Sequence, residues 1–199
     1  MLYQISEKII TSFNLPDNIF LTALISTLLI LIAVLAVGWL IRLISELITS
    51  LLASVIGPGP AFIIRNYVTY IGTIHHEFAH AIVATVTGGK VTKINLFPKG
   101  QTLGSVEFYA RGPHLLRGLQ LSLTAIAPIL CGGITLRLMQ NLVYPNCTEI
   151  WHHILYWYAV ISIFFHMTLS GKDMENFWKG SIPTLLIVYV INLICLALG

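Results

Sequence analysis

The sequence contains few charged residues. Only 10% of its 199 residues are Asp, Glu, Lys or Arg, whereas an average soluble domain has about a quarter. Hydrophobic residues make up 56% of the chain, and the mean hydropathy is +0.84. This composition excludes an ordinary soluble globular domain and predicts a protein that resides in a lipid bilayer.

Cysteine is also scarce. Cys131, Cys147 and Cys195 show neither the paired spacing of a disulfide framework nor the spacing of a cysteine zinc site. The basic residues behind the net charge of +3 are scattered through membrane-flanking loops rather than collected into a stripe. We therefore expect neither a disulfide-stapled secreted domain nor a nucleic-acid partner.

Long uncharged segments are abundant instead. A helix needs roughly 20 apolar residues to cross the hydrocarbon core, and residues 18–41, 118–136, 150–171 and 180–199 meet that need. A fifth segment, residues 62–87, is apolar except for Arg65, His75, His76, Glu77 and His80. We predict an all-α polytopic membrane protein with about five transmembrane helices.

Two other parts of the chain are less regular. Residues 46–60 are apolar but end in a Gly-Pro-Gly-Pro run, so they fit either a span or a re-entrant or interfacial piece. Residues 91–97 and 104–109 are rich in β-forming residues and are separated by a turn-rich connector over 98–103. We predict a β-hairpin within residues 90–112.

The distribution of lysine and arginine predicts the orientation. If the spans alternate from an internal N-terminus, eight basic residues fall on the side that carries the hairpin and three on the other. Basic residues are enriched on the cytoplasmic side of membrane proteins. We therefore expect a multi-pass protein of the cell membrane with a cytoplasmic N-terminus and a cytoplasmic hairpin.

One motif in the fifth span carries chemistry. His76-Glu77-Phe78-Ala79-His80 matches H-E-x-x-H, and residues four apart on a helix differ by only about 40° around its axis. Both imidazoles can thus share a zinc ion, with Glu77 placed to deprotonate a water. Ionisable groups cost about 2.5–3.5 kcal/mol each at mid-membrane, which favours a functional role over a buried polar network that only joins helices.

A catalytic zinc site needs a third protein ligand and leaves its fourth position to water. We favour Asp173, which follows the span over residues 150–171 and is expected at the same membrane face as the motif. The alternative without metal binding is that Asp173 is a solvated charge or a helix cap in a polar turn. The alternative third ligands are Glu175, Glu107 and His166.

The chain resembles the site-2 protease family of intramembrane zinc metalloproteases, peptidase family M50, in a minimal form. The resemblance rests on the H-E-F-A-H sequence within a span, the β element after it, Ala127-Pro128 on a middle helix and an acidic residue on a later helix. It implies that each chain binds one zinc ion through His76, His80 and Asp173. It also implies that Glu77 is the catalytic base.

The residue patterns and the resemblance, which covers about residues 62–180, together predict the organisation of the chain. We expect one membrane-embedded domain over residues 1–199, with an N-terminal surface segment over 1–17, a protease core over 62–180 and the hairpin over 90–112. In the family's second motif an asparagine and a proline precede an Asp-Gly pair, whereas here Asp173 follows Ser170-Gly171-Lys172.

The expected function is that of a zinc-dependent intramembrane endopeptidase. Its partners would be the lipid bilayer and a transmembrane or membrane-associated protein substrate, which a metal-activated water would hydrolyse. One alternative is a catalytically inactive zinc-binding scaffold or a metal carrier in the membrane. Another is a zinc protease that cuts soluble or lipidated peptides at the membrane surface, with a glutamate as third ligand.

Overall fold

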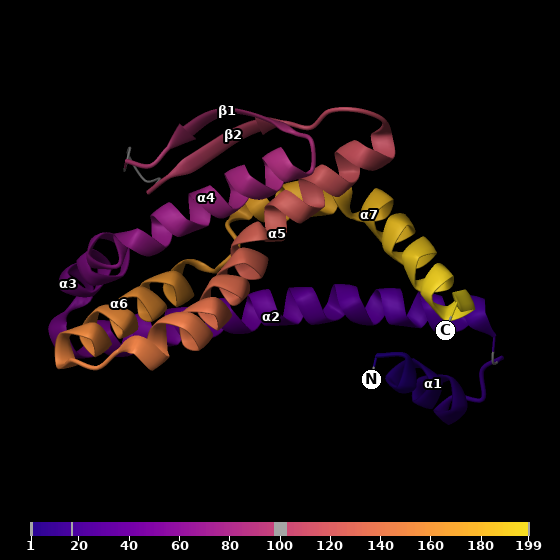
Figure 1. The fold of residues 1–199 in the computed structure, drawn as a ribbon, viewed down its shortest axis with the longest axis horizontal. Coiled ribbons are helices and arrows are strands. Elements are labelled where there is room, and N and C mark those ends of the chain that lie inside the picture. The colour runs from indigo at the N-terminus through magenta and orange to yellow at the C-terminus, as the bar shows by residue number, and fades with distance from the viewer. Residues whose placement is uncertain (1, 17, 98–102, 199) are drawn as a thin grey trace.

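The computed structural model describes residues 2–16, 18–97 and 103–198 of the chain. In these residues the protein is mostly helical, with one small two-stranded sheet (Figure 1). The elements in order are α1 (Leu2–Ser12), α2 (Ile19–Ile56), α3 (Pro58–Ile63), the π-helix η1 (Ile64–Val68), α4 (Tyr70–Val86), β1 (Lys90–Asn95), β2 (Ser105–Tyr109), α5 (His114–Leu138), the π-helix η2 (Met139–Val143), the 3-10 helix η3 (Tyr144–Asn146), α6 (Ile150–His166) and α7 (Gly171–Leu198).

Three of the described helices are long and apolar enough to cross a membrane. They are α2, the continuous helical stretch His114–Asn146 that contains α5, and α7. Helices α4 and α6 have 17 residues each, or about 25 Å of helix, which is shorter than the hydrocarbon core. An integral membrane protein is thus supported, while the number of five spans remains a prediction.

The helix boundaries differ from the hydropathy pattern in several places. Residues 46–56, for which the sequence left a span or a re-entrant piece open, continue helix α2. The helix ends at Ile56 and is followed by its C-cap Gly57, whose φ of 90° suits glycine. The apolar segment over 62–87 is not one helix, because α3 and η1 precede α4.

The helix in the uncharged segment over residues 150–171 also ends earlier than that segment. Helix α6 stops at His166, four residues separate it from α7, and α7 begins at Gly171 rather than near residue 180. The break lies between two helices that both contribute to the cavity described below.

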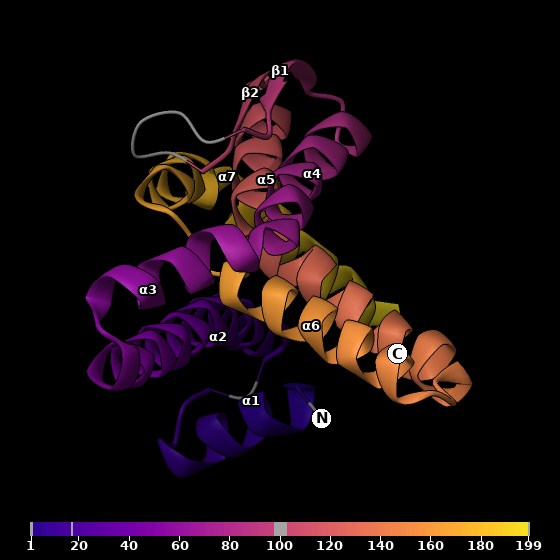
Figure 2. The same ribbon diagram turned by 90° about the vertical axis from the view of Figure 1, so that its left-hand side faces the viewer.

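The predicted hairpin is confirmed. Strand β1 pairs antiparallel with β2 from Lys90 opposite Tyr109 to Asn95 opposite Ser105, with an irregularity between Val91 and Lys93. Most of the predicted connector, residues 98–102, lies outside the described residues. The hairpin packs over α4, as Figures 1 and 2 show from two directions. Its cytoplasmic location remains a prediction.

Glycines allow the helices around the site to approach closely. A methyl group at Gly180 of α7 would collide with the carbonyl oxygen of Gly118 and with Ser122 on α5. Gly72 of α4 lies in the same way against the backbone of Ser162 on α6. Small residues at helix contacts are typical of membrane proteins, where packing rather than water exclusion drives association. These contacts hold α4 against α6 and α5 against α7.

Candidate metal centre

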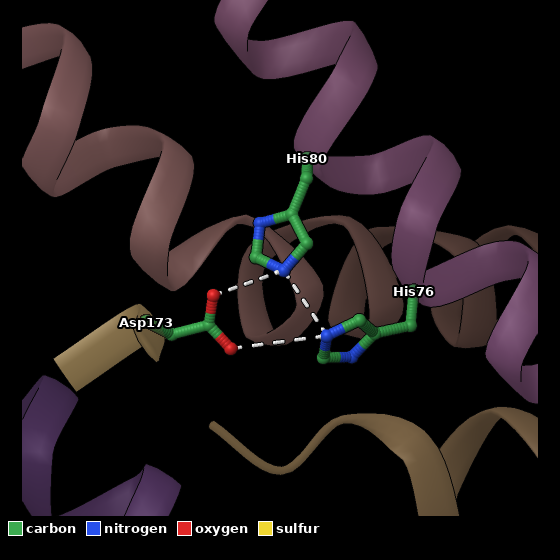
Figure 3. A group of neighbouring side chains, drawn as sticks. All are labelled: His76, His80 and Asp173. Carbon is green, nitrogen blue, oxygen red and sulfur yellow. Dashed lines mark hydrogen bonds and ion pairs between the residues drawn. The ribbon is translucent and has the colours of Figure 1, made fainter. Parts of the chain in front are cut away.

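The two motif histidines and Asp173 meet at one point. His76 and His80 project from successive turns of α4 toward the carboxylate of Asp173, in the first turn of α7 (Figure 3). Nε2 of His80 lies 3.0 Å from Nε2 of His76 and 3.2 Å from Oδ1 of Asp173. Nε2 of His76 lies 3.9 Å from Oδ2 of Asp173. The structure therefore brings together the three residues that the sequence singled out as ligands.

Backbone carbonyl groups orient both imidazole rings. Nδ1 of His76 donates to the carbonyl oxygen of His166 over 2.6 Å, and Nδ1 of His80 donates to that of Thr124 over 2.7 Å. A carbonyl oxygen can only accept, so the proton of each neutral ring is on Nδ1. Each Nε2 then presents a lone pair to the other and to the carboxylate. Three electron-pair donors thus face one another with no proton between them.

A zinc ion fits this donor set. Imidazole nitrogen and carboxylate oxygen are common zinc ligands, and nitrogens bound tetrahedrally would lie about 3.3 Å apart, close to the spacing found here. Histidines that bind zinc usually donate their other ring N–H to a carbonyl or carboxylate, as both do here. Three protein ligands beside a cavity are the arrangement of a catalytic rather than a structural zinc site.

A capping box holds the carboxylate of Asp173. Oδ2 accepts hydrogen bonds from the backbone N–H of Ser170 over 2.8 Å and from its hydroxyl over 2.6 Å. The Ser170 hydroxyl oxygen in turn lies 3.2 Å from the backbone nitrogen of Asp173. This reciprocal pattern is the capping box of a helix N-terminus. Asp173 is therefore the third helical residue of a capping box whose N-cap is Ser170, and it is also a buried member of the cluster, with 7% of its surface exposed.

Glu77 lies beside the cluster, under the start of β2. It is 7% exposed and lines the same cavity as His76 and His80. Gly104 packs directly against it, because a methyl group at position 104 would lie 2.7 Å from Cγ and 3.0 Å from Oε1 of Glu77. The hairpin thus limits the positions that the glutamate side chain can adopt.

The cavity around the cluster has a volume of about 550 Å³, which lies in the range of small-molecule and peptide sites. Its walls come from α4, β2 with the residues before it, α5, the α6–α7 connection and the first turns of α7. Besides the cluster and Glu77, its lining residues include Thr73, Leu103, Ser105, Val106, Phe108, Ala125 and Asn176. Most of the lining residues are polar or charged, and Leu103, Val106, Phe108 and Ala125 add apolar surface.

The alternative third ligands lie elsewhere. Glu175 is on the exposed face of α7, between Lys172 at 3.1 Å and Lys179 at 2.5 Å. Glu107 is on the hairpin, 3.9 Å from Lys93. His166 lines the cavity, but its Nδ1 donates to the carbonyl oxygen of Ser162 and its ring is not part of the cluster.

Sequence reasoning missed several residues of this site. The backbone carbonyl of Thr124 gives no signal in a sequence, and Gly104 looks like an ordinary turn residue. Asn176 could have been found, because its position three residues after Asp173 places both on one face of a helix. Its amide lines the cavity in a chain that lacks the asparagine expected ahead of the aspartate.

Comparison with known families supports the same class of protein. Residues 44–127 match the family described as Peptidase M50B-like, a region that includes α4 with its motif, the hairpin and half of α5. The match supports membership of the chain in the site-2 protease family, peptidase family M50, and the resemblance predicted from the sequence is confirmed. No curated protein and no solved structure matches the chain.

Proposed function

We propose that the protein is a zinc-dependent intramembrane endopeptidase. The observation that carries the proposal is the convergence of two Nε2 lone pairs and a buried carboxylate in a cavity that also contains Glu77. His76, His80 and Asp173 would hold the ion. When bound, zinc polarises the scissile carbonyl and lowers the pKa of water to about 7, so that hydroxide becomes available at neutral pH.

The proton transfers fall to Glu77. It accepts a proton from the attacking water and passes it to the amide nitrogen that leaves, as general acid–base catalysis requires. Its place within the lining of the cavity supports this role. The amide of Asn176, which also lines the cavity, can donate a hydrogen bond to the oxygen on which negative charge develops.

The substrate is a transmembrane or membrane-associated protein that enters the cavity in extended form. Within residues 2–16, 18–97 and 103–198, strand β2 pairs with β1 alone, and its residues Ser105, Val106 and Phe108 line the cavity. An unpaired strand edge can bind an extended peptide by adding it as a further strand. We place this face of the protein on the cytoplasmic side, from which water reaches the site.

The rival functions differ in what they require. A metal carrier needs a second group of ligands along a path, and within the described residues only His76, His80 and Asp173 form such a group. A surface protease with a glutamate ligand needs Glu107 or Glu175 at the cluster, and both are engaged with lysines on exposed faces. An inactive zinc-binding scaffold would use the same three ligands as the protease. Only a measurement of substrate cleavage distinguishes these two functions.

Zinc analysis of the purified protein in detergent tests the proposal. We expect about one zinc ion per chain in the wild type, loss of zinc in His80→Ala and Asp173→Ala, and retention in the surface control Glu175→Ala. Absence of zinc from folded wild type would contradict the proposal. If Asp173→Ala still bound zinc, another residue would be the third ligand.

Turnover is tested with Glu77→Gln. This variant should keep its zinc and lose cleavage of a candidate transmembrane substrate, since an amide cannot accept the proton. Retained cleavage would exclude Glu77 as the base. A wild type that holds zinc but does not cleave a panel of extended and transmembrane peptides would favour the inactive scaffold.

A further inference from the structure

Pro128 lies inside α5, four residues after Thr124. In an α-helix the carbonyl of residue i accepts the N–H of residue i+4, and proline has no N–H. The carbonyl oxygen of Thr124 therefore has no donor within its own helix. The donor that it has instead is Nδ1–H of His80, at 2.7 Å.

The other motif histidine uses a carbonyl that is free for a different reason. His166 is the last residue of α6, and the last four carbonyls of a helix have no partner within it. This carbonyl accepts Nδ1–H of His76 at 2.6 Å. Each ring is thus held by a backbone group that the helix leaves unsatisfied, one at a helix end and one at a proline.

Burial makes the Thr124 carbonyl a strong acceptor. Thr124 is 2% exposed, and Pro128 is among the most deeply buried residues. An unsatisfied carbonyl away from water is costly, so such a group pulls any available donor toward it. Because His80 is buried against it, the ring is fixed with Nε2 directed at His76 and Asp173.

We propose that Pro128 is a positioning residue of the metal centre. By removing one helical donor, it reserves the Thr124 carbonyl for His80, sets the tautomer of that ring and directs its lone pair into the cluster. The inference rests on the proposed function for the identity of the ion. The tautomer of His80 follows from the geometry alone.

Pro128→Ala restores an N–H that competes for the Thr124 carbonyl. We expect zinc affinity to fall about 10- to 100-fold, the usual effect of losing an outer partner of a ligand. The metal-free variant should unfold at the same temperature as the wild type or higher, because the helix gains a hydrogen bond. A purely structural proline would give the opposite pair of results, with lower stability and unchanged affinity.

Pro183 provides a matched control, because it too lies inside a helix, α7, but it is ten residues after Asp173 and packs against Gly118. Pro183→Ala should change zinc affinity by less than about twofold. Competition with a chromophoric chelator measures all three proteins in detergent. An unchanged affinity in folded Pro128→Ala, or equal losses in the two alanine variants, would overturn the proposal.

A second measurement needs no variant. In metal-free wild type labelled with ¹⁵N-histidine, NMR at a pH where the rings are neutral should show His80 protonated on Nδ1 and not on Nε2. The opposite tautomer would overturn the proposal even if Pro128→Ala failed to fold. Absence of zinc binding in the wild type would contradict the proposed function, and an Nε2–H tautomer of His80 would separately overturn the role of Pro128.

Discussion

Gly104 packs directly against Glu77, close enough that a methyl group on its α-carbon would lie 2.7 Å from Cγ of the glutamate. Gly104 immediately precedes β2, whereas Glu77 belongs to α4, the helix that carries His76 and His80. The hairpin is therefore part of the wall around the proposed base, in addition to the role in substrate binding that we propose for it.

Gly104→Ala should lower cleavage by about 100-fold, the smaller end of what general acid–base catalysis contributes. The three atoms nearest to the added methyl group all belong to Glu77, so the change should displace this carboxylate and leave the zinc content unchanged. Turnover and zinc are measured on the same sample. Gly133→Ala is the control, because a methyl group there meets nothing within 4 Å. Unchanged turnover in Gly104→Ala would show that the hairpin does not fix the base.

Ser170→Ala should weaken zinc binding about tenfold, since the Asp173 carboxylate loses the hydroxyl that holds Oδ2. The same change removes the cap of α7 and should lower the free energy of unfolding by about 1 kcal/mol. Chelator competition and thermal unfolding measure the two effects. Ser54→Ala is the control, because that exposed hydroxyl bonds only to the carbonyl of Leu51 in its own helix. Equal zinc affinity in both variants would show that the hydrogen bond from the Ser170 hydroxyl to Asp173 does not contribute to zinc binding.

Glu175→Gln and Glu107→Gln should leave zinc affinity within about twofold of the wild type. Both carboxylates are exposed and interact with lysines, and exposed ion pairs contribute only about 0–1 kcal/mol. Titration of the metal-free proteins with zinc measures the affinity, with Asp173→Asn as the sensitive comparison. A loss of zinc in either glutamine variant would reinstate a glutamate as third ligand.

Thr73→Val should raise the free energy of unfolding of the metal-free protein by about 1 kcal/mol. The buried Thr73 hydroxyl has no partner in the described part of the chain, and removing such a group avoids its desolvation cost. Thr85→Val on the same helix is the matched control and should be destabilising, because its hydroxyl donates to the carbonyl of Ala81 over 2.8 Å. Thermal unfolding in detergent compares the two. Destabilisation of Thr73→Val would reveal a partner for its hydroxyl.

The part of the site that the sequence predicts is the part that depends on helical spacing. His76, Glu77 and His80 follow from one turn of one helix, and Asp173 stands out as an acidic residue just after an uncharged segment. The hairpin follows from two β-forming runs around a turn, and the structure has it.

The remainder depends on backbone groups and on contacts distant in sequence. Hydropathy cannot mark the end of α6, because Met167 and Leu169 are as apolar as the helix before them. The break is made by the capping box of Ser170 and Asp173, which hydropathy does not record. The acceptor for His80 is a main-chain carbonyl, and its only trace in the sequence is the proline four residues later.

The separation of the ligands along the chain has a consequence for biosynthesis. The two histidines lie on α4 and Asp173 lies on α7, so the hairpin, α5 and α6 are all translated between them. Domains begin to fold from the N-terminus while synthesis continues. A nascent chain with α4 already in the membrane therefore has the histidines and Glu77 but only two of the three ligands. The proposed metal centre can be completed only once α7 has left the ribosome and packed against α5, so an unfinished copy of the proposed protease would lack its full ligand set and could not cut its neighbours.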